Sequence, residues 1–245
     1  MKFQIHSIIR VSSRQTQLAG IVLLVVLATT LSSSAEDIGK TLNRVFSKSV
    51  RDTEKAFKDN TWFDAAIHWT ASENKGGIET IVANRAYFFQ GHNYMRYNLW
   101  VDEQDQGLKN ITAGWEWPDD SRWNNGIDAA LCWNKRQIAY LFKDHYYLRY
   151  NMRTNKIEGN QPITRGWAGN VPWDDGVDAA VYWRDDRAMF FSGSRYWSYD
   201  LANDTCSSVY PISRIFPNIP SSFSSDIDSA LNGGNGKIYL FKGDQ

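Results

Sequence analysis

From residue 63 onward the chain consists of short apolar and aromatic runs separated by turn residues. One run recurs four times: FDAAIHW at Phe63, IDAALCW at Ile127, VDAAVYW at Val177 and IDSALNG at Ile227. A second pattern follows the first three copies: AYFFQGHNYMRYN from Ala86, AYLFKDHYYLRYN from Ala139 and AMFFSGSRYWSYD from Ala188. Two apolar stretches that meet at a tight turn predict a β-hairpin in each repeat.

The spacing of the motif aspartates defines the repeat. Asp64, Asp128, Asp178 and Asp228 are 64, 50 and 50 residues apart. The first interval is longer because it contains the segment 70–78, whose composition predicts a loop. A third landmark, ITAGW, ITRGW or ISRIF, precedes each new copy, so each repeat predicts about four short strands. Because one small sheet cannot bury both of its faces, the sheets must stack with aromatic residues between them, as in a β-propeller.

The DAA motif, the FF or LF strand, the YxRY-like strand and the approach from Ile to Trp resemble hemopexin-like repeats over residues 63–245. The resemblance implies an all-β, four-bladed β-propeller, as in hemopexin, vitronectin, the C-terminal domains of matrix metalloproteinases and plant albumin-2. The repeats span about 63–126, 127–176, 177–226 and 227–245, and the fourth lacks two outer strands. Either the sequence is incomplete at its C-terminus, or an open edge at 239–241 invites a partner chain or a homodimer.

The N-terminus has the pattern of a targeting segment. Basic residues precede an apolar run, Leu18–Leu31, and small residues follow at Ser33–Ala35, which predicts a signal peptide over residues 1–35 and a secreted protein. The run is shorter than the roughly 20 residues that span a bilayer, so no stable span is expected after cleavage, with a signal anchor as the alternative. Apolar positions at helical spacing predict an amphipathic helical segment over residues 36–62.

Composition excludes some classes of function. Lys plus Arg and Asp plus Glu each number 27, a balance that excludes a polybasic nucleic-acid binder.

Two cysteines, Cys132 and Cys206, could pair in an oxidising compartment or stay apart. The sequons at Asn110 and Asn203 predict glycosylation on the outer parts of two blades.

We expect an ion site along the innermost strands of the blades. Its edge faces the central channel, where backbone groups lack a strand partner. The resemblance implies that calcium, or else sodium or chloride, binds main-chain atoms of two rings: Asp64, Asp128, Asp178 and Asp228, then Ala66, Ala130, Ala180 and Ala230. A second interpretation, given equal weight, is that the alanines simply permit close approach of the strands.

Haem binding is an alternative that rests on histidine. His92 and His145 occupy hairpin turns, so His68, at the fifth motif position, is the candidate haem ligand. In hemopexin, haem capture needs two propellers, so that role does not transfer by position. The sequence carries no HExxH, GxSxG or phosphate-binding glycine loop, and we predict that it is not an enzyme.

The tryptophans of the segments between repeats have two interpretations. Trp115, Trp117, Trp123, Trp167 and Trp173 either fill wedges between blades, which their repetition favours, or line a ligand-binding surface, for which Trp117 is the better candidate. The sequence thus predicts a secreted binding module for an extracellular protein or a small ligand. The alternatives are a haem- or polyamine-binding storage or scavenging protein like albumin-2, and a fragment of a larger matrix or protease-associated protein.

Overall fold

The computed structural model describes residues 63–242, except 102, 170 and 234–235, together with three two-residue strands nearer the N-terminus. Most of the predicted signal peptide and the predicted helical segment 36–62 lie outside the described residues. No helix in the described part is long and apolar enough to span a membrane.

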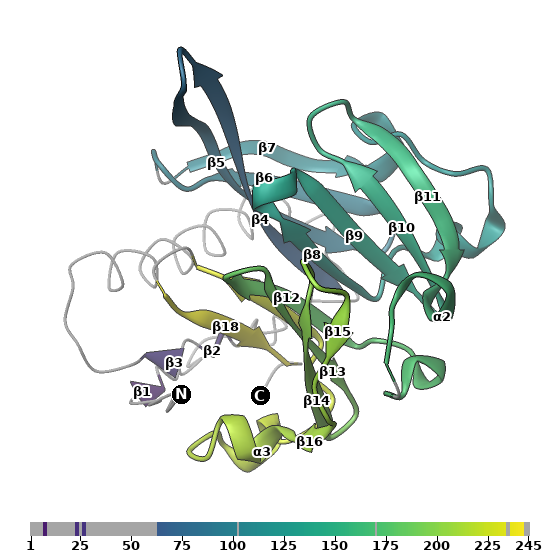
Figure 1. The fold of residues 1–245 in the computed structure, drawn as a ribbon. Helices are drawn as coiled ribbons and strands as arrows, with labels where there is room; N and C mark the ends of the chain where they lie inside the picture. Colours follow the sequence, from purple (N-terminus) through teal and green to yellow (C-terminus); the bar gives the residue numbers. More distant parts are fainter. Residues whose placement is uncertain are drawn as a thin grey trace, which may run out of the picture.

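Four antiparallel sheets follow one another along the chain (Figure 1). Blade I contains β4 (Ala65–Lys75), β5 (Ile78–Gln90), β6 (Asn93–Asn98) and β7 (Glu103–Asn110). Blade II contains β8 (Ala129–Trp133), β9 (Ile138–Lys143), β10 (Tyr146–Asn151) and β11 (Lys156–Pro162). Blade III contains β12 (Ala179–Arg184), β13 (Arg187–Ser192), β14 (Arg195–Asp200), β15 (Thr205–Cys206) and β16 (Tyr210–Pro211). Blade IV contains β17 (Ser229–Asn232), β18 (Ile238–Phe241) and β2 (Leu23–Leu24).

Short helices link the blades, in keeping with the proline, glycine and serine of these segments. They are η1 (Ile111–Ala113), η2 (Ser121–Asn125), α2 (Ile163–Gly166), η4 (Trp173–Asp175), α3 (Ile212–Ile215) and η5 (Ser221–Phe223), while η3 (Asn134–Arg136) lies within blade II. The remaining strands, β1 (Ser7–Ile8) and β3 (Val26–Leu27), pair with each other.

The innermost strands close a ring. β4 contacts β8, β8 contacts β12, β12 contacts β17, and β17 contacts β4. The first three strands of blades I–III and the two strands β17 and β18 of blade IV follow the same antiparallel order outward. The predicted all-β, four-bladed propeller is therefore confirmed.

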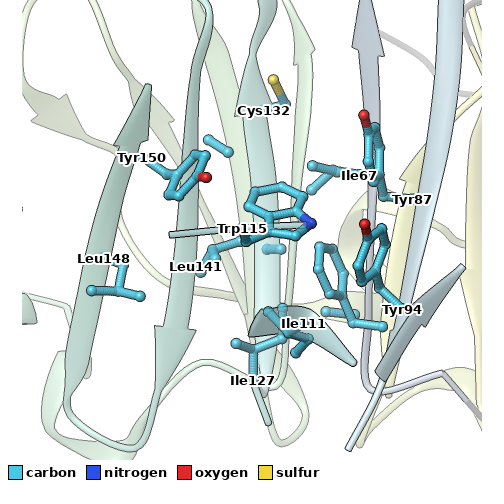
Figure 2. Packing of buried hydrophobic residues seen from close by; sticks show 14 of the residues in the cluster. Ile67, Tyr87, Tyr94, Ile111, Trp115, Ile127, Cys132, Leu141, Leu148 and Tyr150 are labelled. Carbon is cyan, nitrogen blue, oxygen red and sulfur yellow. The ribbon is translucent and has the colours of Figure 1, made fainter. Parts of the chain in front are cut away.

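Aromatic residues fill the wedges between blades, as predicted. Figure 2 shows Trp115 between blades I and II, with Tyr87 and Tyr94 on one side and Tyr150 on the other. Four of the five tryptophans are at most 5% exposed: Trp115, Trp123, Trp167 and Trp173. Trp117, the surface candidate, is half-buried with its ring edge-on to Trp123 at a centroid distance of 6.0 Å.

Two neighbouring alanines of one motif serve different wedges. Ala129 packs in the wedge between blades II and III, whereas Ala130 packs in the wedge between blades I and II. Successive side chains of a strand point to opposite faces of its sheet, and each face of a blade meets a different neighbour. The two alanines let both neighbouring blades approach the inner strand closely.

Two expectations from the sequence are corrected. The segment 70–78 is not a loop, because β4 and β5 continue as a paired ribbon as far as Lys75 and Ile78. Gly76 and Gly77 form the turn with φ of +64° and +86°, values that glycine adopts without strain. The edge expected to be open at 239–241 is paired in part, because β2 places Leu24 opposite Leu240 and Leu23 opposite Phe241. Among the described residues blade IV still has three strands, fewer than the other blades, as the repeat pattern predicts.

Blade IV carries a serine where the other motifs have alanine. The Ser229 hydroxyl is buried and has no hydrogen-bond partner among the described residues. Ser229→Ala should raise the free energy of unfolding by about 1 kcal/mol, because a buried hydroxyl without a partner is removed. Urea unfolding measures the change. The reciprocal variant Ala179→Ser should lose stability, and a Ser229→Ala protein less stable than the wild type would contradict the interpretation.

Candidate functional site

A cavity of about 470 Å³ opens at the end of the channel where the inner strands begin. It is lined by Phe63, Asp64, Asn125, Ile127, Asp128, Lys143, Asp178, Asp226, Ile227 and Asp228. The structure therefore brings together the four motif aspartates and adds a fifth, Asp226, which the repeat pattern did not single out. Five carboxylates and one ammonium group give this lining a negative charge.

The motif aspartates are positioned by their own backbones. Each donates its N–H to the carbonyl oxygen of the last aromatic residue in the second strand of its blade, at 2.8–2.9 Å: Asp64 to Phe89, Asp128 to Phe142, Asp178 to Phe191 and Asp228 to Phe241. This bond repeats without exception in the four blades. It fixes the start of the inner strand at the cavity wall.

Three of the carboxylates also hold the neighbouring hairpin turn. Asp64 Oδ2 accepts from the N–H of Gly91 at 2.6 Å, and Asp178 Oδ2 accepts from the N–H of Gly193 at 2.6 Å. Asp128 Oδ2 accepts in the same way from the N–H of the turn residue Asp144 at 2.8 Å. The motif aspartate thus has a structural role through its carboxylate. The sequence analysis missed this role because it considered only the main-chain atoms of the motif as ion ligands.

Burial and like charges act on two of these acids. Burial raises the pKa of Asp64, the N–H of Gly91 lowers it, and the negative charges of Asp128 and Asp228 raise it further. Asp178 shows the same balance: burial raises its pKa, and the N–H of Gly193 offsets part of the rise. Both carboxylates are therefore less stable as anions than an exposed aspartate.

The second predicted ring lies in the wedges. Ala66, Ala130, Ala180 and Ala230 are all at most 2% exposed. Their packing agrees with the close-approach interpretation, while ion binding by carbonyl oxygens stays a prediction. Within the described residues, no three or more His, Cys, Asp or Glu side chains are arranged to hold a metal ion. A cation at the cavity would therefore need main-chain atoms or water as additional ligands.

The opposite end of the channel is nearly filled. A space of about 10 Å³ remains there, and the fifth motif residues His68, Cys132, Tyr182 and Asn232 line it with their neighbours. The Nδ2 of Asn232 donates to the carbonyls of Tyr182 and Trp183 at 2.9 and 2.7 Å. These bonds fasten blade IV to blade III at this end.

His68 has little freedom in this position. Its Nε2 lies 2.6 Å from Oδ1 of Asn84, and burial lowers its pKa, although the Asn84 contact acts in the opposite direction. The backbone carbonyl of His68 accepts from Nδ2 of Asn134 at 3.0 Å. A space that holds about one water molecule does not admit a porphyrin, so the surroundings of His68 do not favour haem ligation.

The other predicted residues lie away from the cavity. Cys132 and Cys206 are free; Cys132 is buried between blades I and II, and Cys206 packs against the wedge between blades II and III. Asn110 and Asn203 are exposed, as glycosylation requires. The side chain of Asn110 caps η1 by accepting from the N–H of Thr112. Their glycosylation stays a prediction.

Comparisons with known proteins give the same result as the repeats. A family model described as Hemopexin matches residues 177–221. Matrix metalloproteinase-21 of Cynops pyrrhogaster is 26% identical over 225 residues, which covers 76% of this chain and 35% of that protein. The human protein of the same name is 36% identical over 121 residues, 44% of this chain and 20% of its own length. The chain therefore spans about a third or less of the length of these relatives.

Solved structures share the fold. The hemopexin fold protein CP4 from cow pea superposes with a TM-score of 0.61 at 22% identity, covering 74% of this chain and 83% of CP4. A plant albumin from Cicer arietinum showing hemagglutination has a TM-score of 0.62 at 20% identity, covering 75% of this chain and 84% of the albumin. This chain carries hemopexin-like repeats. The acidic cavity is thus the mouth of the central channel of a hemopexin-like propeller.

Proposed function

We propose that this hemopexin-like propeller is a secreted, non-catalytic binding module that holds a cation at the mouth of its channel. The supporting observation is the cavity into which four equivalent aspartates and Asp226 converge. A concentration of negative charge in a concave site attracts cations and raises their local concentration. It disfavours chloride, the anion among the ions that the family resemblance implied.

The size of the cavity supports a hydrated hard cation. Calcium takes about six to eight oxygen ligands, including carboxylates, carbonyls and waters. Since a water molecule occupies about 30 Å³, such a coordination shell needs about 200 Å³, well within the cavity of about 470 Å³. The remaining space leaves a short polyamine as a second candidate. The module would recruit an extracellular protein or small ligand through this mouth or the surrounding blade faces.

Calcium is expected to stabilise the folded chain. At a concentration 100 times its dissociation constant, it should raise the free energy of unfolding by about 2.7 kcal/mol, because it binds the folded state preferentially. Differential scanning calorimetry with EDTA and then added CaCl₂ measures the shift. Asp178→Asn should reduce it, while keeping an acceptor for the N–H of Gly193. Asp185→Asn, at a side chain that is 83% exposed, is the matched control.

The dependence of binding on pH separates this site from exposed carboxylates. Because the folded-state pKa values of Asp64 and Asp178 are raised, both acids take up protons at a higher pH than exposed aspartates do. Calcium affinity should fall over that range as the pH is lowered. Without calcium, the free energy of unfolding should instead gain from a lower pH. Because the two pKa values are higher in the folded state than in the unfolded state, protonation of these acids favours the folded state. Spermidine in place of calcium tests the second candidate, and the absence of a shift with either cation would refute the proposal.

A further inference from the structure

The exposed apolar side chains of the protein gather in one part of blade I. Within the part of the chain that the structure describes, the large apolar side chains that are between 43% and 70% exposed are Ile78, Ile81, Val82, Trp100 and Val101. Three of them come from the first half of β5, and two follow the end of β6. An apolar patch that stays in water in this way marks a surface where another molecule binds.

The outer edge of β5 is open along the same residues. β4 and β5 pair as far as Lys75 and Ile78, whereas the pairing of β5 with β6 begins only at Arg85. No strand among the described residues therefore pairs with the outer edge of residues 78–83, which belong to a two-stranded ribbon that projects from blade I (Figure 1). Because a ribbon of two strands is marginally stable in water, a third strand along this edge would stabilise it.

The turn after β6 borders one end of this open edge. The N–H of Leu99 donates to the carbonyl oxygen of Asn84 at 2.9 Å, next to the point where the edge opens. Trp100 and Val101 follow directly in the chain, so the two groups of exposed side chains belong to one surface. This surface combines backbone donors and acceptors with apolar area.

The backbone edge favours a protein strand over a lipid surface. In hydrocarbon its N–H and C=O groups would lose their hydrogen bonds to water, whereas an added strand satisfies them. Residues 78–83, IETIVA, suit a second copy of the same chain, because four of them are β-branched and one is charged. Antiparallel pairing about a two-fold axis between Thr80 and Ile81 places Glu79 opposite Val82, so no like charges face each other.

The exposed area is sufficient for a weak dimer. A large apolar side chain presents on the order of 100–250 Å² when it is fully exposed, so these five together leave about 500 Å² of apolar surface. Two copies would bury about 1,000 Å², before the backbone edges are counted, which is the lower limit for a specific interface. An interface of this size is expected to form at micromolar concentrations.

We propose that two copies of this chain form a two-fold dimer in which their β5 edges pair antiparallel over residues 78–83. Trp100 and Val101 of each copy then flank the joined sheet, and each ribbon gains a third strand. The contact lies on blade I, away from the edge at 239–241 where the sequence suggested a homodimer. It does not depend on the cation site, because none of the cavity residues takes part in it.

Sedimentation velocity of the purified full chain, from low to several hundred micromolar, measures the dimer. The wild type should dimerise with a dissociation constant in the micromolar range. Ile81→Lys should raise this constant about a hundredfold, because each dimer loses two isoleucine contacts and gains two ammonium groups at the paired edge. Thr154→Lys is the matched control and should leave the constant unchanged, since it adds the same charge at an exposed β-branched residue between β10 and β11. Circular dichroism checks that each variant is folded.

A second substitution tests the register. In the proposed pairing, residue 80 of each copy lies opposite residue 81 of the other. Adding Thr80→Glu to Ile81→Lys should therefore lower the dissociation constant about tenfold relative to Ile81→Lys alone, since each new carboxylate faces a new ammonium group. A double variant that dimerises no better than Ile81→Lys would contradict this pairing.

Hydrogen exchange identifies what covers the edge. If a second copy covers it, backbone amides within residues 78–83 should gain protection as the concentration rises. Protection that is the same at every concentration would show that another segment of the same chain lies there, and would overturn the proposal. A wild type that stays monomeric, a dimer that Ile81→Lys leaves intact, or equal weakening by Thr154→Lys would each overturn it as well. None of these results bears on the binding of calcium.

Discussion

Trp167→Ala is expected to lower the free energy of unfolding by about 3–5 kcal/mol. Trp167 is 5% exposed and lies in the wedge between blades II and III. Its ring meets Tyr140 and Tyr199 at centroid distances of 4.9 Å and Phe190 at 5.1 Å. These three aromatic rings are fixed on strands and cannot move in to fill the space without moving the strands themselves. Truncation of Trp167 therefore leaves a cavity and loses these contacts.

Chemical denaturation, followed by circular dichroism, measures this loss. Trp100→Ala is the matched control, because it makes the same substitution at a side chain that is 54% exposed. That variant should stay within about 0.5 kcal/mol of the wild type. Equal losses in the two variants would show that the wedges contribute little to stability.

Gly126→Ala is the second change expected to be severe, at about 2–4 kcal/mol. Gly126 has φ of +85° and ψ of −156°, a region that is essentially restricted to glycine. An added Cβ would also lie 2.4 Å from the carbonyl oxygen of Gly91 in the hairpin turn of blade I. Backbone strain and a backbone collision therefore act together at the junction between two blades.

Gly176→Ala separates these two causes. Gly176 is the equivalent residue before the third motif and has a similar φ of +81°, but its added Cβ would lie 3.4 Å from the carbonyl oxygen of Asp144. It should show the strain alone and a smaller loss, about 1–3 kcal/mol. Thermal unfolding of both variants gives the difference. An equal loss in the two proteins would show that the collision with Gly91 is relieved without cost.

The sequence was sufficient to predict the propeller because each blade repeats the same contacts. The DAA motif recurs because its two small residues lie in neighbouring wedges, and the aspartate recurs because its carboxylate accepts the hairpin-turn N–H in three of the four blades. The intervening tryptophans, such as Trp115 and Trp167, also repeat for a packing reason. The gathering of the four motif aspartates at one end of the channel follows from this symmetry.

What the sequence could not provide lies where the blades differ. The ribbon at 70–78 has the composition of a loop, and only its register with the opposite strand shows that it is paired. Asp226 belongs to no repeated motif, and its place at the channel mouth depends on the geometry of the turns. The filled far end likewise depends on four unlike residues, among them His68 and Asn232, which share only their position.

The wedge between blades IV and I is expected to close late in folding. It joins Ala66 of the first repeat to Leu231 of the last, although these residues come from the two ends of the array. Contacts between distant parts of a chain slow folding, because the loop between them must be ordered first. During synthesis the first three blades emerge before the fourth, so the face of blade I that carries Ala66 stays uncovered until translation reaches β17. This period is the one in which chaperones would have most to protect.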